Sequence, residues 1–247
     1  MTTQNLSGKT AIITGSSRGI GRAIAERLAA DGANVVVTFH GSADKANEVV
    51  EKIKAASNVK AVAVQLDMRD LTSVRGLFAA AIEHFGKIDI FVNNAAGVNV
   101  FKPTTEMSEA EYDSMFLITR GVFFAMQEAA KRLADNGRIV SISTGGTTMA
   151  MAGGGAYAGS KAAIEQFSNA LAKELGGRQI TVNTIAPGVT ETDGLVLNKE
   201  QINQLVAQTP LGRLGKPADI ADAIALLVSD DARWITGQNI RVTGGIV

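Results

Sequence analysis

The sequence of 247 residues predicts a doubly wound α/β fold, with a central parallel sheet of about seven strands and helices on both of its faces. Short apolar, β-branched runs alternate with longer segments of helical periodicity from one end of the chain to the other. The short runs are apolar on both faces, which is typical of parallel strands that helices cover from both sides. No linker, repeat or low-complexity segment interrupts this alternation, so we expect residues 1–247 to form one domain.

Each element is predicted from the period of its apolar residues. The predicted strands are seven short runs, at residues 10–13, 34–38, 61–64, 88–92, 138–142, 180–185 and 239–242. The predicted helices lie between them, at residues 21–31, 43–56, 73–85, 155–175 and 218–229.

The composition excludes several kinds of site. The chain has no cysteine, which excludes disulfides, cysteine-ligated zinc and thiol catalysis. Its two histidines, His40 and His84, give little support to a metal site, and we expect none. Lys+Arg and Asp+Glu number 24 each, so the charge balance gives no support to nucleic-acid binding.

Two sequence features indicate where the protein is found. No stretch approaches the roughly 18 uninterrupted apolar residues of a membrane-spanning helix, so no membrane association is expected. The first five residues, MTTQN, lack the charged and then apolar pattern of a signal peptide, which predicts a cytoplasmic location.

A glycine-rich loop follows the first predicted strand and leads directly into a helix. Its sequence, TGSSRGIG at residues 14–21, has the spacing G-x-x-x-G-x-G. Glycines allow a tight turn and let backbone N–H groups approach a pyrophosphate at the positive end of the helix. The alternative is a turn without a ligand. The residues expected to contact a dinucleotide here are Gly15, Ser17, Arg18, Gly19, Ile20 and Gly21.

The end of the second strand indicates which dinucleotide would bind. A carboxylate about twenty positions after the loop would pair with the ribose hydroxyls of NAD. Here the strand is followed by His40, Gly41 and Ser42, and the first carboxylate is Asp44. Arg18, His40 and Ser42 suit a 2′-phosphate instead, which favours NADP(H), although His40 could equally be a solvated loop residue.

Tyr157 and Lys161 form the candidate catalytic pair. They lie four residues apart in a predicted helix, so their side chains share one face. A free tyrosine has a pKa of about 10, and a neighbouring cation lowers it. The pair can therefore exchange a proton with a carbonyl or alcohol oxygen.

The glycine loop, the Tyr-Lys pair and their order together resemble the short-chain dehydrogenase/reductase family, from about residue 6 to the C-terminus. This resemblance implies a Rossmann-type fold and an NAD(P)-dependent oxidoreductase that acts on alcohols and ketones. Tyr157 would exchange the proton, while Lys161 would hold the nicotinamide ribose and lower the pKa of the tyrosine.

The resemblance also implies further cofactor contacts. Asn93 opens a segment, NNAAG, that is similar to the Asn-Asn-Ala-Gly motif of the family. Further matching positions follow the third strand, where an acidic residue contacts adenine, and the sixth strand, near the nicotinamide amide and the phosphates. These positions are Asp67, Met68, Pro187, Gly188, Thr190 and Thr192.

Two positions depart from the family pattern. The family carries a serine thirteen residues before the tyrosine, and here that residue is Thr144, which keeps the hydroxyl and adds a methyl group. Ser143 would replace it only if the strand register differed. The family asparagine of the helix after the fourth strand is absent near Thr119, although a backbone carbonyl of Ile118 or Thr119 could take its part.

Three functions follow from these features. The first is NADPH-dependent reduction of a ketone to a secondary alcohol, as in 3-oxoacyl carrier-protein, polyketide and naphthol reductases. The second is an NAD(P)-dependent alcohol or sugar dehydrogenase, and the third is a catalytically impaired homologue that binds a nucleotide. The resemblance also implies a homotetramer, a small-molecule substrate and a substrate lid at about residues 190–210.

Overall fold

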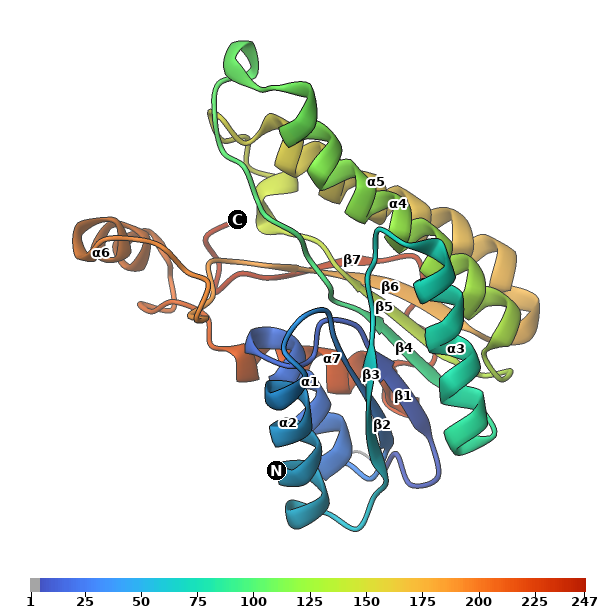
Figure 1. The fold of residues 1–247 in the computed structure, drawn as a ribbon. Helices are drawn as coiled ribbons and strands as arrows, with labels where there is room; N and C mark the ends of the chain where they lie inside the picture. Colours follow the sequence, from blue (N-terminus) through green and yellow to red (C-terminus); the bar gives the residue numbers. More distant parts are fainter. Residues whose placement is uncertain (1–4) are drawn as a thin grey trace.

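All seven predicted strands join one parallel sheet in the computed structural model, which describes residues 5–247 (Figure 1). The strands are β1 (Thr10–Ile13), β2 (Asn34–Phe39), β3 (Ala61–Gln65), β4 (Ile90–Asn93), β5 (Arg138–Ile142), β6 (Thr181–Pro187) and β7 (Asn239–Val242). Their order in the sheet is β3-β2-β1-β4-β5-β6-β7, and every pairing is parallel. The predicted fold class is therefore confirmed.

Helices cover both faces of this sheet, as Figure 1 shows. The helices of the described residues are α1 (Gly19–Ala30), α2 (Ala43–Ala56), α3 (Leu71–Phe85), α4 (Glu109–Arg132), α5 (Gly155–Leu175), α6 (Lys199–Gln208) and α7 (Pro217–Val228). Alternate residues of β1 belong to two separate apolar cores. Ala11 and Ile13 pack with α1, α2 and α7, whereas Ile12 packs with α3, α4 and α5. Each face of the sheet thus buries its own layer of three helices, which explains why the strands are apolar on both sides.

Two helices were not predicted as elements, α4 and α6. Each begins with a capping box, formed by Ser108 and Glu111 in α4 and by Asn198 and Gln201 in α6. Helix α4 is buried along one side, and the helical spacing of its aromatic residues was visible in the sequence. Helix α6 has no buried residue and stands apart from both helical layers (Figure 1).

The strand order changes direction at β1, and this change places the candidate site. β1 pairs with β2 on one side and with β4 on the other. The chain therefore extends the sheet from β1 toward one edge through β2 and β3, and then toward the other edge through β4 to β7. In such folds ligands bind in the crevice beyond the carboxyl ends of the strands at this point. The glycine loop after β1 and the segments after β4, β5 and β6 all lie at that edge.

Two statements concern the cellular setting. Among residues 5–247 no helix combines the length and the apolar character needed to cross a bilayer. Residues 1–4, on which the predicted cytoplasmic location partly depends, lie outside the described residues.

A pair of glycine substitutions tests the packing of α4 on the sheet. A Cβ at Gly121 of α4 would lie 1.9 Å from the backbone oxygen of Met68, whereas a Cβ at Gly76 of α3 would meet nothing within 4 Å. We expect Gly121→Ala to lower the free energy of unfolding by about 1–3 kcal/mol, because the backbone must shift. Gly76→Ala should raise it by about 0.5–1 kcal/mol, because glycine is unfavourable inside a helix. Urea denaturation of both variants measures the difference, and equal effects would contradict the packing described.

Candidate active site

The glycine loop between β1 and α1 has the geometry of a phosphate-binding turn. Gly15 and Gly19 have φ angles of +66° and +56°, which glycine adopts without strain. A Cβ at Gly21 would lie 2.2 Å from the Gly15 oxygen, so no larger residue fits. Arg18 occupies the N-cap position of α1 and its side chain does not cap the helix. The N–H groups of the first helical turn therefore face the same edge as the loop.

Hydrogen bonds join this loop to the segment after β4. The Thr14 hydroxyl accepts from the N–H groups of Asn94 and Ala95 at 2.9 and 2.8 Å. The Asn94 amide donates to the carbonyls of Thr14 and Gly15 at 2.9 and 3.1 Å. Sequence reasoning singled out Asn93, which ends β4 and is buried, and missed the structural part that Asn94 plays. The signal that could have found it was the second asparagine of the same motif.

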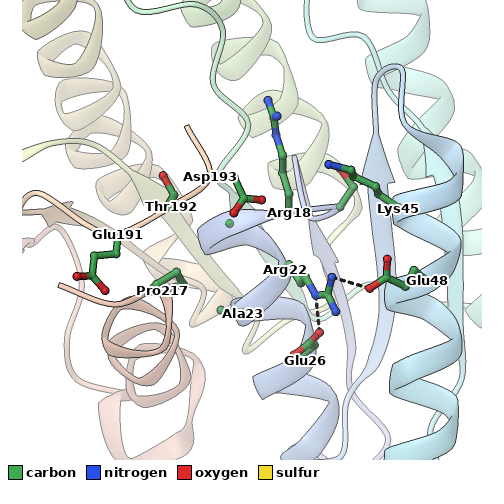
Figure 2. A pocket seen from close by; sticks show the side chains of 12 residues that line it. Arg18, Arg22, Ala23, Glu26, Lys45, Glu48, Glu191, Thr192, Asp193 and Pro217 are labelled. Carbon is green, nitrogen blue, oxygen red and sulfur yellow. Dashed lines mark hydrogen bonds and ion pairs between the residues drawn. The ribbon is translucent and has the colours of Figure 1, made fainter. Parts of the chain in front are cut away.

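A pocket of about 460 Å³ lies beside the N-terminus of α1. Arg18, the N-cap residue of α1, and Lys45 of α2 lie at one end of it, the pocket mouth, and the Arg18 side chain points away from Arg22 (Figure 2). Arg22 lies deeper in the pocket and is neutralised by Glu26 and Glu48, at N···O distances of 2.8 and 2.9 Å. Arg18 and Lys45 therefore supply positive charge at the mouth, although the carboxylates of Glu191 and Asp193 also line the pocket. Lys45 was not predicted. Ser17 also lines this pocket, and Ser42 is exposed at the N-cap of α2.

The structure brings together His40 and Asp67, two residues predicted to contact the adenosine part of the cofactor. His40 Nε2 lies 3.4 Å from Asp67 Oδ2 and 3.2 Å from Arg69 Nη2. Arg69 donates from its side chain to both carboxylate oxygens of Asp67, and this holds the pKa of Asp67 well below its usual range. Met68 beside them is buried, and its carbonyl packs against α4.

The segment after β6 closes over the glycine loop. Pro187 ends β6, and a Cβ at Gly188 would lie 2.9 Å from Thr243 Cα, so β6 and β7 approach closely there. Thr190 is buried and donates to the Gly188 carbonyl at 3.0 Å. Thr192 lines the pocket in Figure 2, and its methyl carbon would lie 3.7 Å from a Cβ at Gly19. Thr192 and the glycine loop therefore face the same space.

The candidate catalytic residues meet between β5 and α5. Tyr157 and Lys161 lie on the first turns of α5, and Thr144 is the second residue after the end of β5. The Thr144 side chain interacts with the Tyr157 phenol. The Ser143 hydroxyl instead donates to Glu165 at 2.5 Å, so the hydroxyl that faces the tyrosine belongs to Thr144.

Burial shifts the pKa of both residues of the pair. It raises the pKa of the Tyr157 phenol above its ordinary value, and the interaction with Thr144 partly offsets this rise. It lowers the pKa of the Lys161 ammonium from 10.5 to about 8. Lys161 donates to the carbonyl of Ile142 at 3.3 Å. Burial and Thr144 are the causes of the Tyr157 shift, and the expected lowering of the tyrosine pKa by Lys161 stays a prediction.

Thr119 occupies the region where the family asparagine is absent. It is buried on α4, and its hydroxyl lies 3.3 Å from the carbonyl of Ser160 on α5. A cavity of about 20 Å³, close to the size of one water molecule, is lined by Ile118, Thr119 and Lys161 among others. Helix α4 is continuous through this segment, so the missing residue leaves no break in the helix.

Phe101 lies against the candidate proton donor and was not predicted. The centroids of the Phe101 and Tyr157 rings are 5.0 Å apart, and 51% of Phe101 is exposed. The Lys102 N–H donates to the Gly153 carbonyl at 3.0 Å, which holds this segment beside the start of α5. Met151 is also exposed there. Phe101 therefore forms an apolar surface on one side of the phenol.

The arrangement matches known oxidoreductases over nearly its whole length. A family model described as enoyl-(acyl carrier protein) reductase matches residues 15–247. A short-chain dehydrogenase from Burkholderia cenocepacia, solved in complex with NADP, superposes with a TM-score of 0.93 at 38% identity, over 98% of this chain and 99% of that chain. The chain belongs to the short-chain dehydrogenase/reductase family. It is therefore an oxidoreductase by family.

Two further relatives have named activities. The hydroxynaphthalene reductase-like protein Arp2 of Metarhizium majus is 42% identical over 262 residues, which cover 100% of this chain and 97% of that protein. The angucycline C-6 ketoreductase LanV, solved with bound NADP, superposes with a TM-score of 0.92 at 39% identity, over 98% of this chain and 97% of that chain.

Among residues 5–247 of this chain, no group of three His, Asp or Glu side chains could hold a metal ion.

The depressed pKa of Lys161 predicts a specific pH dependence of stability. Between pH 8 and pH 10.5 the unfolded chain binds the lysine proton and the folded chain has released it, so the free energy of unfolding rises with pH. Lys161→Met removes this group and keeps an apolar stem of similar length. We expect the free energy of unfolding of the wild type, relative to that of Lys161→Met, to grow by on the order of 2 kcal/mol as the pH rises through this window. Urea denaturation at several pH values measures it, and parallel pH profiles would show that Lys161 titrates normally.

Proposed function

We propose that the protein is an NADPH-dependent reductase that converts a ketone to a secondary alcohol. The observation that carries this proposal is the convergence of the Tyr157 phenol, the Thr144 hydroxyl and Lys161 at the sheet edge that also holds the glycine loop. Hydroxyl donors that point at one oxygen stabilise the negative charge that develops on it during reduction. The relatives solved with NADP and named as reductases support the same reaction class.

The residues present suit NADP(H). The site at Gly21 leaves no room for a side chain, which permits close approach of a pyrophosphate. No carboxylate follows β2 to pair with a ribose 2′-hydroxyl, and Arg18 and Lys45 stand at the pocket mouth. Arg18, Ser42 and Lys45 would hold the 2′-phosphate, while Thr192 and the loop N–H groups would hold the pyrophosphate. When bound, the nicotinamide supplies the hydride.

The protein residues would supply the proton and the orientation. Burial raises the pKa of Tyr157, so the phenol is neutral near pH 7 and can donate its proton to the carbonyl oxygen. Thr144 would donate to the same oxygen and hold it in place. Lys161 would fix the ribose and assist the return of a proton to Tyr157. A protonated phenol is the form that donates to the carbonyl oxygen during reduction.

The surroundings of Tyr157 suit a large apolar ketone. Phe101 offers a ring face, and Met151 offers a thioether, which makes favourable contacts with aromatic groups. The segment at residues 190–210, which includes α6, would cover the substrate as a lid. Val196, at 92% exposed, is an apolar side chain of this segment that a substrate would bury.

Two other properties stay predictions. A homotetramer is implied by the family resemblance, and the exposed Phe123 of α4, packed edge-to-face on Phe167 of α5, provides an apolar surface for such contacts. A cytoplasmic location is the second of these predictions. We also propose that residues 1–247 act as a single catalytic domain.

Replacement of the tyrosine tests the proposed function. Tyr157→Phe removes only the phenolic oxygen and should lower kcat for ketone reduction by about 100-fold or more, because it removes the proton donor. Tyr112→Phe changes the only other tyrosine of the chain and should leave kcat unchanged. The measurement is NADPH consumption with ketones, quinones and acyl thioesters.

The possible results separate the three functions. Turnover of ketones that Tyr157→Phe abolishes supports the reductase, and equal turnover by both proteins would refute the role given to Tyr157. Oxidation of alcohols with no ketone reduction would favour the dehydrogenase. Binding of NADPH without turnover of any substrate would favour an impaired homologue.

Cofactor preference depends on the charge at the pocket mouth. Arg18→Gln should weaken NADP⁺ binding by roughly 10- to 100-fold, because one charge-assisted hydrogen bond to phosphate is lost, and should change NAD⁺ binding little. Arg75→Gln is the matched control, since Arg75 is an exposed arginine of α3 that does not line the pocket. Calorimetric titration gives both dissociation constants. A similar loss of NAD⁺ affinity would show that Arg18 does not read the 2′-phosphate.

A further inference from the structure

Glu165 contacts the segment that carries Thr144, and neither the proposed mechanism nor the family resemblance assigns it a role. It lies on α5, one helical turn beyond Lys161. The hydroxyls of Ser143 and Thr147 both donate to its Oε1 oxygen, at 2.5 and 2.7 Å. Hydrogen bonds to a carboxylate are stronger than those between neutral groups. The two donors stand on either side of Thr144 in the sequence.

Helix α5 therefore holds residues 142–147 at three places. Tyr157, Lys161 and Glu165 recur every four residues, so their side chains share one face of the helix. Lys161 donates to the Ile142 carbonyl at 3.3 Å, and Glu165 accepts from the two hydroxyls. Thr144 lies between these held positions and meets Tyr157. These contacts hold the segment around Thr144 in place, and so they limit how far its hydroxyl can move from the phenol.

The turn itself leaves the Thr144 hydroxyl proton available. Thr144 Oγ1 accepts from the Gly146 N–H at 3.2 Å, which uses one lone pair of the oxygen. The Thr147 hydroxyl also lies 3.0 Å from the Thr144 carbonyl, so the residue bound by Glu165 is in contact with the catalytic threonine's own backbone. The orientation of Thr144 is thus coupled to the carboxylate.

A simple ion pair does not account for Glu165. Lys161 is one turn away, yet its ammonium bonds to the Ile142 carbonyl, and the ion pairs of residues 5–247 do not include Glu165. Its described partners are the two hydroxyls. This carboxylate therefore contacts the turn after β5 and not the substrate side of the site.

We propose that Glu165 is a positioning residue, which clamps the turn after β5 to α5 and so fixes the Thr144 hydroxyl against the Tyr157 phenol. Its effect on the reaction rests on the proposed function, but its effect on Tyr157 can be measured without substrate or cofactor. Helix α5 then carries both the proton donor, Tyr157, and the residue that positions the Thr144 hydroxyl beside it, Glu165.

The first test is the titration of Tyr157 itself. In a Tyr112→Phe background Tyr157 is the only tyrosine, so the ultraviolet absorbance of tyrosinate reports its pKa alone. Loss of the Thr144 interaction raises this pKa, because that interaction favours the phenolate. We expect Glu165→Ala and Thr144→Val to raise the Tyr157 pKa by similar amounts. Glu165→Gln keeps an acceptor oxygen and should leave it near the parent value, and Glu174→Ala, an exposed site on the same helix, should have no effect.

The second test is a double-variant cycle on ketone reduction. Glu165→Ala should lower kcat by about 10- to 100-fold through misplacement of Thr144, with the dissociation constant of NADPH unchanged. In the Thr144→Val background it should cause no further loss, because the group it positions is gone. The pair Ser143→Ala and Thr147→Val removes the donors instead of the carboxylate and should reproduce the effect.

These results also separate the inference from the proposed function. If the wild type reduces no ketone, the proposed function fails and the tyrosine titration still decides the role of Glu165. An unchanged Tyr157 pKa in Glu165→Ala, or a kcat loss that multiplies with that of Thr144→Val, would overturn the proposal. If Glu165→Ala does not fold, as judged by circular dichroism, the donor variants Ser143→Ala and Thr147→Val take its place in both tests.

Discussion

The parallel alignment of β1, β4, β5 and β6 is the constraint on which the site depends. Parallel strands bring all their carboxyl ends to one edge, so residues far apart in the chain meet there. The bonds from Thr14 to the N–H groups of Asn94 and Ala95 tie two of these ends together. The glycine loop can then keep its shape while α5 presents Tyr157 and Lys161 from the neighbouring part of the same edge.

Desolvation has opposite consequences for the two residues of the catalytic pair. It raises the pKa of the phenol and lowers that of the ammonium, because both charged forms lose water. The two pKa values, which lie close together for the free side chains, are therefore moved apart. Near pH 7 the buried phenol keeps its proton, while the buried ammonium releases its proton more readily than a free lysine does. On an exposed helix neither group would be desolvated, and both pKa values would stay near those of the free side chains.

The sequence was sufficient for the strands, for the glycine loop and for the Tyr157–Lys161 spacing, because each depends on a local period or a local turn. The family resemblance also indicated Thr144 as the hydroxyl next to the tyrosine, and strand alternation made Ser143 the less favoured alternative. The sequence did not indicate Phe101, Lys45 or Glu165. Their contacts join segments that only the tertiary structure brings together, such as Ser143 with Glu165 across 22 positions.

The packing of α4 against α5 shows what stands in place of the missing family asparagine. Thr119 is a buried residue of an unbroken helix, and its hydroxyl approaches the Ser160 carbonyl beside Lys161. In place of the asparagine there is therefore a polar contact between α4 and α5, with a water-sized cavity beside it. The sequence alone shows only a missing side chain and neither of these features.

The lack of buried residues in α6 bears on how such a protein changes over evolutionary time. Substitutions in a segment that contributes nothing to the core cost little folding free energy, so selection can alter them for substrate fit alone. The residues around Gly21 and Gly121 have no such freedom, because even one added methyl group meets backbone. New substrate ranges can thus arise in the one part of the chain where sequence change and loss of the fold are separate events.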